Sequence, residues 1–284
     1  MPRHSHRARV FTGWAMLLLV AFACSENTAP LPSGSVRFIP PPVYSLWWSM
    51  AEACSGRTGT LGDIQWYTVP NVDSIPAGDE EVSGYWSSGD NRIVLIGAGQ
   101  FNGTLVRHEM LHALLRVKGH PRSQFVGACA GLVDCRGACL SDAGPAPIPP
   151  VDTPRVPPDS LELGIELQPA TPGVNVFDGY FTLAVTARNP ADHAVVVLLT
   201  PSGNSDPSVS FTCLVVGQGT RLSFTEWAWD PEATYFAPGE TKRRVFDLVE
   251  GTAPGAANIG LGSFAVTAAF GRTPILRQSI LLAP

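Results

Sequence analysis

The spacing of hydrophobic positions divides the chain into two parts. In the first part, apolar residues recur at helical spacing in Val43–Cys54 and in Leu105–Val117. Two runs rich in β-branched and aromatic residues, Ile64–Val69 and Arg92–Ile96, are typical of strands. Residues 73–90 between them are polar and rich in glycine, which indicates turns. The pattern therefore predicts a small α+β domain.

Local signals set the expected ends of the two helices. Gly56 follows the first helix as a stop signal, and Asn102 or Thr104 can cap the start of the second. Gly119 occupies the position expected for a C-terminal glycine, and Pro121 blocks any continuation. We expect the second helix to run up to Gly119.

The second part of the chain has the pattern of an all-β domain. Residues 143–160 are rich in proline and predict an extended linker. Residues 161–284 then contain about seven short apolar runs separated by Gly, Pro, Asn and Asp. The runs are LELGIEL, YFTLAVTAR, AVVVLL, SVSFTCLVV, RRVFDL, SFAVTAAF and ILRQSILL. Their spacing predicts an antiparallel β-sandwich.

Residues 1–24 are predicted to be a signal peptide. Three arginines precede the apolar stretch Trp14–Ala23, which is too short to span a bilayer. Cleavage has two interpretations: an A-x-A site for signal peptidase, or a lipobox in which Cys24 becomes lipidated. The polar residues after Cys24 favour a cell-envelope lipoprotein, periplasmic or at the surface, over a secreted protein. Residues 25–42 are predicted to be a tether.

Export implies an oxidising compartment, so the remaining cysteines are candidates for disulfides. Cys135 and Cys139 are close enough in sequence to close one loop, and Cys54 with Cys129 would link the first helix to the segment after the second. Cys213 makes an odd number, and the sequence does not fix the connectivity.

The composition is that of two globular domains. The chain has 284 residues, of which 45% are hydrophobic and 15% charged, and its net charge is −5. Because no cluster of Lys and Arg occurs beyond the leader, we expect no nucleic-acid partner. We expect a monomer that touches a membrane only through a lipid anchor.

The second helix contains the sequence His108-Glu109-Met110-Leu111-His112. Two histidines four residues apart lie on one face of a helix, so both imidazoles can reach one metal ion. The Glu109 carboxylate projects beside that ion and can take a proton from a water molecule. The motif predicts a site for one Zn²⁺ ion, with Glu109 as general base.

A third ligand is expected from the residues after the helix. We favour His120, because Gly119 and Pro121 permit the turn that would bring its ring back to the metal. The alternatives are Asp134, Asp142 and Glu162, or a role for His120 as a cation at the helix end.

These residues carry a resemblance to a known family. The stretch Arg107–Phe125, RHEMLHALLRVKGHPRSQF, resembles the zincin metallopeptidases. The likeness spans roughly residues 43–140 and implies a zincin-like domain over residues 43–142. Carried over by position, it implies that the helix ligands are His108 and His112, the general base is Glu109, and the third ligand is His120.

The resemblance departs from one branch of the family. Metzincins have glycine three residues after the second histidine and a third ligand three residues further on, where this chain has Leu115 and Lys118. A non-metzincin type is therefore implied. In zincins the strand before the metal helix is usually a sheet edge, so Arg92–Ile96 is expected to be an edge that pairs with an extended peptide substrate, with an ordinary core strand as the alternative.

The C-terminal part resembles bacterial Ig-like sandwiches and, more loosely, a proteinase-inhibitor domain. The likeness depends on Arg188-Asn189-Pro190, on the turn Ala237–Thr241 and on the strand beginning at Gly262. It implies a spacer or adhesion module, or a domain that docks on the cleft.

The sequence thus predicts a zinc-dependent endopeptidase at the bacterial cell envelope, with a peptide or protein as substrate. One alternative is a surface-binding protein in which the metal is structural and the β-sandwich binds a partner. Another is an amidase that cleaves peptidoglycan by the same chemistry.

Overall fold

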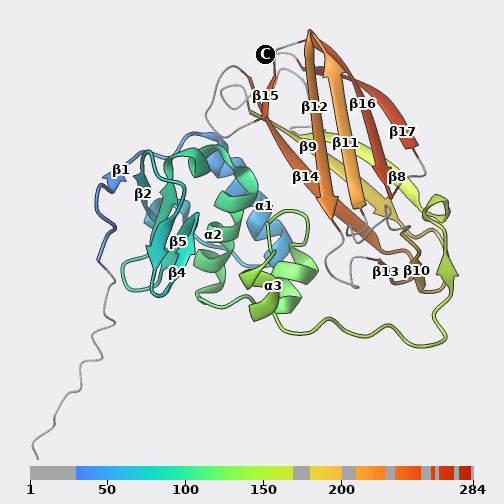
Figure 1. The fold of residues 1–284 in the computed structure, drawn as a ribbon, viewed down its shortest axis with the longest axis horizontal. Helices are drawn as coiled ribbons and strands as arrows, with labels where there is room; N and C mark the ends of the chain where they lie inside the picture. Colours follow the sequence, from blue (N-terminus) through green and yellow to red (C-terminus); the bar gives the residue numbers. More distant parts are fainter. Residues whose placement is uncertain are drawn as a thin grey trace, which may run out of the picture.

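The computed structural model describes residues 30–168, 180–199, 209–227, 234–250, 257–259, 262–271 and 275–282. The predicted leader, including Cys24, lies outside these ranges. Within them, no helix is both long and apolar enough to cross a membrane. The architecture is mixed α+β, and most of its regular structure is in sheets (Figure 1).

The N-terminal part contains a four-stranded sheet with the order β1-β2-β6-β5. Its strands are β1 (Val36–Arg37), β2 (Gln65–Val69), β5 (Gly84–Ser87) and β6 (Arg92–Ile96). β2 and β6 are parallel, whereas β1 and β5 pair antiparallel with their neighbours. Both predicted strands are confirmed, and part of the expected tether contributes β1.

The predicted edge position of Arg92–Ile96 is wrong. β6 lies between β2 and β5, and its first four residues are buried. The edge strand beside the second helix is β5, which follows a hairpin formed by β3 (Ile75–Ala77) and β4 (Glu80–Val82). These strands are too short to show a clear alternation of hydrophobic and polar residues, so the turn-rich pattern concealed them.

Both predicted helices are present, as α1 (Val43–Ser55) and α2 (Gly103–Leu115). α1 ends at Gly56, which has the left-handed φ of 65° that glycine adopts without steric cost. Asn102 caps α2, because its side-chain oxygen accepts the backbone N–H of Leu105 at 3.2 Å.

The predicted end of α2 at Gly119 is wrong. Arg116 takes the left-handed C-cap conformation instead, with a φ of 57°. This conformation costs a non-glycine residue about 1–2 kcal/mol. The Arg116 N–H donates to the His112 carbonyl at 2.8 Å, and the Arg116 guanidinium donates to Asn91 Oδ1 at 2.9 Å. The helix therefore ends early, and the chain turns back before it reaches His120.

Two disulfides join predicted cysteines. Cys54 in α1 bonds to Cys129, which follows a turn of π-helix at Ser123–Ala128. Cys135 bonds to Cys139 in α3 (Ala138–Asp142). Both pairs are those considered from the sequence. They indicate an oxidising compartment, such as the periplasm or the cell exterior.

In the C-terminal part, two four-stranded sheets share one hydrophobic core. The first has the order β15-β14-β9-β8, formed by β8 (Glu162–Gln168), β9 (Tyr180–Arg188), β14 (Thr241–Glu250) and β15 (Ala257–Ile259). The second has the order β12-β11-β16-β17, formed by β11 (Val209–Gly217), β12 (Thr220–Trp227), β16 (Gly262–Phe270) and β17 (Ile275–Leu282). Side chains such as Leu183 and Val215 fill the space between the two sheets.

The expectation of a purely antiparallel sandwich is wrong at one pair, because β14 and β15 are parallel. A third sheet with the order β13-β10-β7 adjoins the sandwich. It consists of β7 (Arg155–Val156), β10 (Val195–Val197) and β13 (Tyr235–Phe236). Since β7 lies within the predicted linker and pairs with β10, the end of that proline-rich segment belongs to the C-terminal part.

We expect the Cys213 thiol to resist alkylation in the folded chain. Cys213 is buried in the sandwich core, and this burial raises the pKa of its thiol to about 12. The reactive thiolate is therefore nearly absent at pH 8. Iodoacetamide labelling, mapped by mass spectrometry, should modify Cys213 in denaturant and leave it unmodified in native buffer. Equal labelling under both conditions would contradict a closed core.

Candidate metal centre

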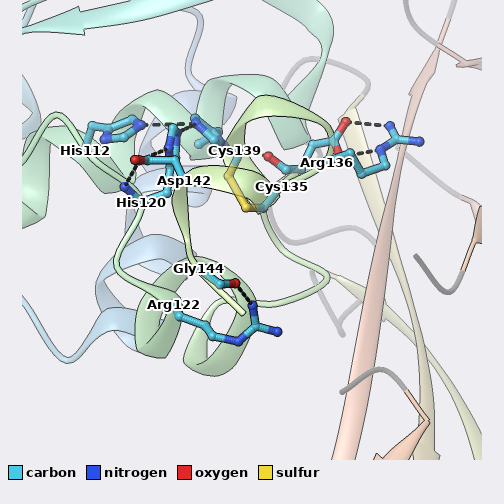
Figure 2. Close-up of a disulfide and its surroundings, with 10 residues drawn as sticks. His112, His120, Arg122, Cys135, Arg136, Cys139, Asp142 and Gly144 are labelled. Carbon is cyan, nitrogen blue, oxygen red and sulfur yellow. Dashed lines mark hydrogen bonds and ion pairs between the residues drawn. A yellow bond between two sulfur atoms is a disulfide. The ribbon is translucent and has the colours of Figure 1, made fainter. Parts of the chain in front are cut away.

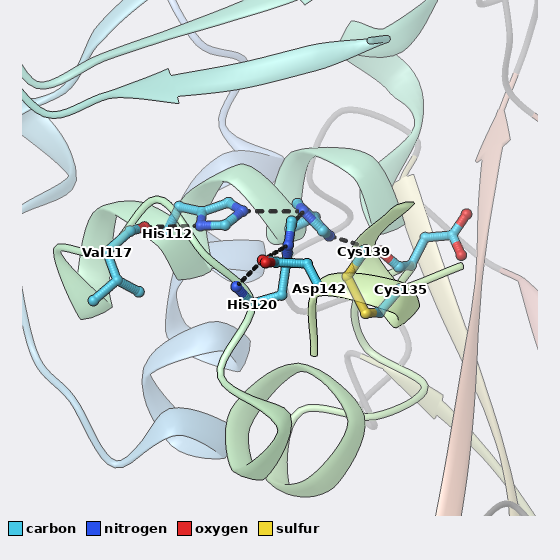
Figure 3. Close-up of polar contacts among 8 residues, drawn as sticks. His112, Val117, His120, Cys135, Cys139 and Asp142 are labelled. Carbon is cyan, nitrogen blue, oxygen red and sulfur yellow. Dashed lines mark hydrogen bonds and ion pairs between the residues drawn. A yellow bond between two sulfur atoms is a disulfide. The ribbon is translucent and has the colours of Figure 1, made fainter. Parts of the chain in front are cut away.

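Three imidazoles meet at one point beside α2. His108 and His112 project from the helix, and His120 reaches them from the segment that turns back after it. His108 Nε2 lies 3.1 Å from His112 Nε2 and 3.2 Å from His120 Nε2. The structure thus brings together all three histidines predicted as ligands. Figure 3 shows two of them, His112 and His120, with Asp142 beside His120.

Backbone carbonyls fix the tautomers of the two helix histidines. His108 Nδ1 lies 2.6 Å from the Asp134 carbonyl, and His112 Nδ1 lies 2.9 Å from the Val117 carbonyl. A carbonyl only accepts, so each Nδ1 carries the proton. Burial, followed by repulsion from a neighbouring imidazole, lowers the pKa of His108 to about 4 and that of His112 to about 3. Both rings are therefore neutral at pH 7, and each Nε2 presents a lone pair.

A carboxylate orients the third ring. Asp142 Oδ2 accepts the backbone N–H of His120 at 2.9 Å and its Nδ1–H at 2.8 Å. These hydrogen bonds hold the pKa of Asp142 below its usual value, so the group is an anion at neutral pH. His120 Nδ1 therefore carries a proton, and its Nε2 faces that of His108.

The contact between the Nε2 atoms of His108 and His112 is not a hydrogen bond, because neither of these atoms carries a hydrogen. Two lone pairs 3.1 Å apart, with a third ring nitrogen 3.2 Å from His108 Nε2, form an arrangement that a shared cation stabilises. Each Nδ1 has the carbonyl or carboxylate partner that metal-bound histidines usually have. The donor set therefore fits a metal ion.

An aromatic ring packs against all three histidines. The Phe125 ring centroid lies 5.0 Å from those of His108 and His120 and 4.7 Å from that of His112. Phe125 is itself buried, so it limits rotation of the imidazoles and excludes water from one side of them.

Cys139 also lies near this point. The possible ligand atoms of His108, His120 and Cys139 are all within 4.8 Å of one another. However, the Cys139 sulfur is bonded to Cys135, so it is not the thiolate that binds metals (Figure 2). His112 Nε2 is therefore a better third donor, beside the nitrogens of His108 and His120, than this sulfur is.

The other residues considered as a third ligand have different partners. The Asp134 carboxylate accepts two hydrogen bonds from Arg136, at 2.6 and 2.5 Å. Burial alone would raise the pKa of Asp134, but Arg136 brings it below its usual value. Glu162 forms an exposed ion pair with Arg188 on the sandwich. Asp142 holds His120 in place.

The three histidines open into a cleft of about 910 Å³ that Glu109 also lines. Residues of the β3–β4 hairpin and of β5 form another part of its wall. Glu109 is 3% exposed and lies against β5, since its Cγ is 3.5 Å from where a side chain on Gly84 would begin. Burial raises the pKa of Glu109 to about 8, and a hydrogen bond from the Trp86 backbone opposes this rise.

Sequence reasoning missed the contacts that orient the ligands. Val117 acts through its carbonyl, which leaves no trace in the side-chain pattern. Asp134 and Asp142 were considered only as direct ligands. Their positions on either side of the segment bounded by Cys135 and Cys139 were the one available signal, since a short disulfide loop keeps nearby residues together.

Comparisons with known proteins add no assignment. No family model and no curated protein matches the chain. Among solved structures, a β-glucosidase from Erythrobacter marinus is 14% identical with a TM-score of 0.23, over 43% of this chain and 16% of that one. A β-glucosidase from Listeria innocua bound to glucose is 11% identical with a TM-score of 0.24, over 44% and 16%. The match therefore spans about a sixth of those enzymes, and similarity at this level indicates neither a family nor an activity.

Replacing the carboxylate behind His120 should weaken metal binding. In Asp142→Asn, the His120 ring loses its anionic partner and its Nε2 becomes less basic, so we expect a 10- to 100-fold loss of divalent-metal affinity. Competition with a chromophoric chelator measures it. Asp192→Asn is the matched control, because Asp192 pairs with exposed His193 on the sandwich. Equal affinities in both variants would contradict the role of Asp142.

Proposed function

We propose that this chain is a zinc-dependent endopeptidase of the bacterial cell envelope. The observation that carries the proposal is that the Nε2 atoms of three histidines meet at 3.1–3.2 Å around His108 and line the same cleft as Glu109. The resemblance of Arg107–Phe125 to zincins supports the same activity.

The donor set favours zinc. Two imidazole nitrogens bound to one zinc at 2.0–2.1 Å with tetrahedral angles are about 3.3 Å apart, close to the 3.1 and 3.2 Å found here. Structural zinc sites have four protein ligands, whereas catalytic sites have three and an open position. In the described part of the chain, the nearby Cys139 is excluded as a fourth ligand by its disulfide. This favours a catalytic site over the alternative of a structural metal.

When bound, zinc supplies Lewis acidity that lowers the pKa of water to about 7 and polarises a carbonyl. His108, His112 and His120 would hold it. Burial favours the neutral acid of Glu109, and a bound cation would favour its carboxylate. In that ionised form Glu109 would take a proton from water and deliver it to the leaving amine. Its burial against β5 keeps the carboxylate in a poorly solvated position, where a proton is readily held.

The edge strand gives the substrate a place to bind. β5 has one neighbour in the sheet, β6, and its residues line the cleft next to Glu109. An extended peptide can pair with such an edge through backbone hydrogen bonds. β5 therefore takes the role that the sequence had suggested for Arg92–Ile96.

The location follows from the chain's chemistry. The two disulfides favour an exported protein. The predicted lipidation of Cys24 would hold the enzyme at a membrane surface, with residues 25–35 as a tether to the first strand.

Glu109→Gln should abolish peptide hydrolysis without removing the metal. The amide cannot accept the proton from water, so we expect kcat to fall at least 100-fold while zinc content stays near one per chain. A fluorogenic peptide library and elemental analysis measure the two quantities. Glu80→Gln is the matched control, because Glu80 lines the same cleft and is exposed. If Glu109→Gln hydrolyses peptides as fast as the wild type, the general-base role is wrong; a wild type that holds zinc but hydrolyses no peptide would instead favour a structural metal.

His120→Ala should lose most of the bound zinc. Removing one of three nitrogen donors leaves only the helix pair, so the purified variant should contain far less than one zinc per chain by elemental analysis. His193→Ala, which removes an exposed histidine on the sandwich, should retain it. A wild-type chain that binds no zinc would overturn the proposed function.

A further inference from the structure

The C-terminal sandwich contacts α2 through a buried ion pair. Arg107, the residue before His108, is fully buried, and its Nη1 and Nη2 each donate to one carboxylate oxygen of Asp247 at 2.9 Å. Asp247 belongs to β14, and its side chain is 9% exposed. Paired hydrogen bonds between buried charges are strong and specific in direction. Losing one partner leaves an uncompensated buried charge.

The same arginine holds the loop that orients His108. Arg107 Nε donates to the Leu132 carbonyl at 2.7 Å, and two residues later the Asp134 carbonyl accepts the Nδ1–H of His108. The other side of this loop is bonded to the sandwich, because the Val245 N–H donates to the Gly131 carbonyl at 2.9 Å. α2 and β14 thus hold the loop between them.

Two glycines allow this close approach. A side chain on Gly131 would begin 1.6 Å from the Arg243 carbonyl oxygen, and one on Gly103 would begin 2.3 Å from Asp247 Oδ2. Apolar side chains continue the contact, since Ala184 and Val245 of the sandwich belong to the same core cluster as Val106, Met110 and Leu132.

The described residues of the sandwich contact α2 and the loop of residues 131–134, and none of them lines the cleft. Among the described residues, those that line the cleft all precede residue 140. α2 contacts β5, whose residues line the cleft, and it also contacts β14 of the sandwich (Figure 1). This arrangement does not match a domain that blocks the site, nor a spacer that hangs from a linker.

We propose that the sandwich is a structural half of the metal centre, in which Asp247 is a positioning residue. Through Arg107, Asp247 fixes the loop of residues 131–134, and the loop fixes the tautomer and direction of His108. The inference rests on the proposed function only in that the three histidines bind zinc. It makes metal affinity depend on a residue 139 positions away from His108 in the chain (247 minus 108).

The test uses the full-length chain and Asp247→Asn. Loss of a contact that orients a ligand typically lowers metal affinity 10- to 100-fold, so we expect at least a 10-fold weaker zinc affinity in chelator competition. The visible spectrum of the cobalt-loaded variant should also change, because the His108 ring shifts; a loss of overall stability alone leaves the spectrum of folded molecules unchanged. Glu162→Gln, which breaks an exposed ion pair on the same sheet, is the matched control. Protection of Cys213 from alkylation reports whether the sandwich is folded.

A second measurement needs no variant. Coupling between two sites is reciprocal, so zinc should slow hydrogen exchange of the Val245 amide in the wild-type chain and leave amides of β16, in the opposite sheet, unchanged. This measurement decides the matter if Asp247→Asn does not fold.

The outcomes separate the two proposals. A wild-type chain without zinc overturns the proposed function, and the inference with it. A zinc-binding wild type whose Asp247→Asn variant folds with the same affinity and cobalt spectrum overturns the inference alone. Unchanged exchange at Val245 on zinc binding does the same.

Discussion

Ring nitrogens that meet without a hydrogen between them cannot be satisfied by the protein alone. The carbonyls of Asp134 and Val117 and the carboxylate of Asp142 accept the Nδ1–H groups of the three histidines, and the Nε2 atoms of neutral His108 and His112 therefore face each other without a hydrogen. Such an arrangement costs free energy unless a cation is bound. Several features of the N-terminal part hold the three rings in this arrangement. The early end of α2 lets the chain turn back so that His120 reaches the helix histidines, Phe125 packs against the rings, and the loop of residues 131–134 supplies a carbonyl to His108. The structure keeps unfavourable contacts at the place where a ligand can relieve them.

Much of the N-terminal architecture was predictable because its signals are local. Helical spacing gave α1 and α2 to within a few residues, and β-branched runs gave β2 and β6. What failed depended on tertiary contacts. Arg116 takes the place of the expected glycine cap, and its guanidinium donates a hydrogen bond to Asn91 Oδ1. Nothing in the sequence around either residue predicts this contact.

The C-terminal sheets show a similar division. Apolar strands such as β9 and β16 were found by pattern, whereas β12 was missed because TRLSFTEW mixes charged and hydroxyl residues with few apolar ones. The parallel pairing of β15 and the strand within the linker depend on long-range pairing, which periodicity does not report. At the candidate site, spacing predicted the helix histidines, and the turn residues favoured His120. The contact of Arg107 with Asp247 joins segments 140 residues apart and had no signal.

The two disulfides give the site a dependence on its surroundings. Asp134 and Asp142, which orient His108 and His120, lie before and after the segment closed by the Cys135–Cys139 disulfide. The Cys54–Cys129 disulfide links α1 to the end of the π-helical turn at Ser123–Ala128. Closing a loop of 75 residues stabilises the folded chain by about 4 kcal/mol in the chain-entropy account. In a reducing cytosol this contribution is missing. Chains whose four cysteines are reduced would therefore hold the two loops that orient His108 and His120 less firmly.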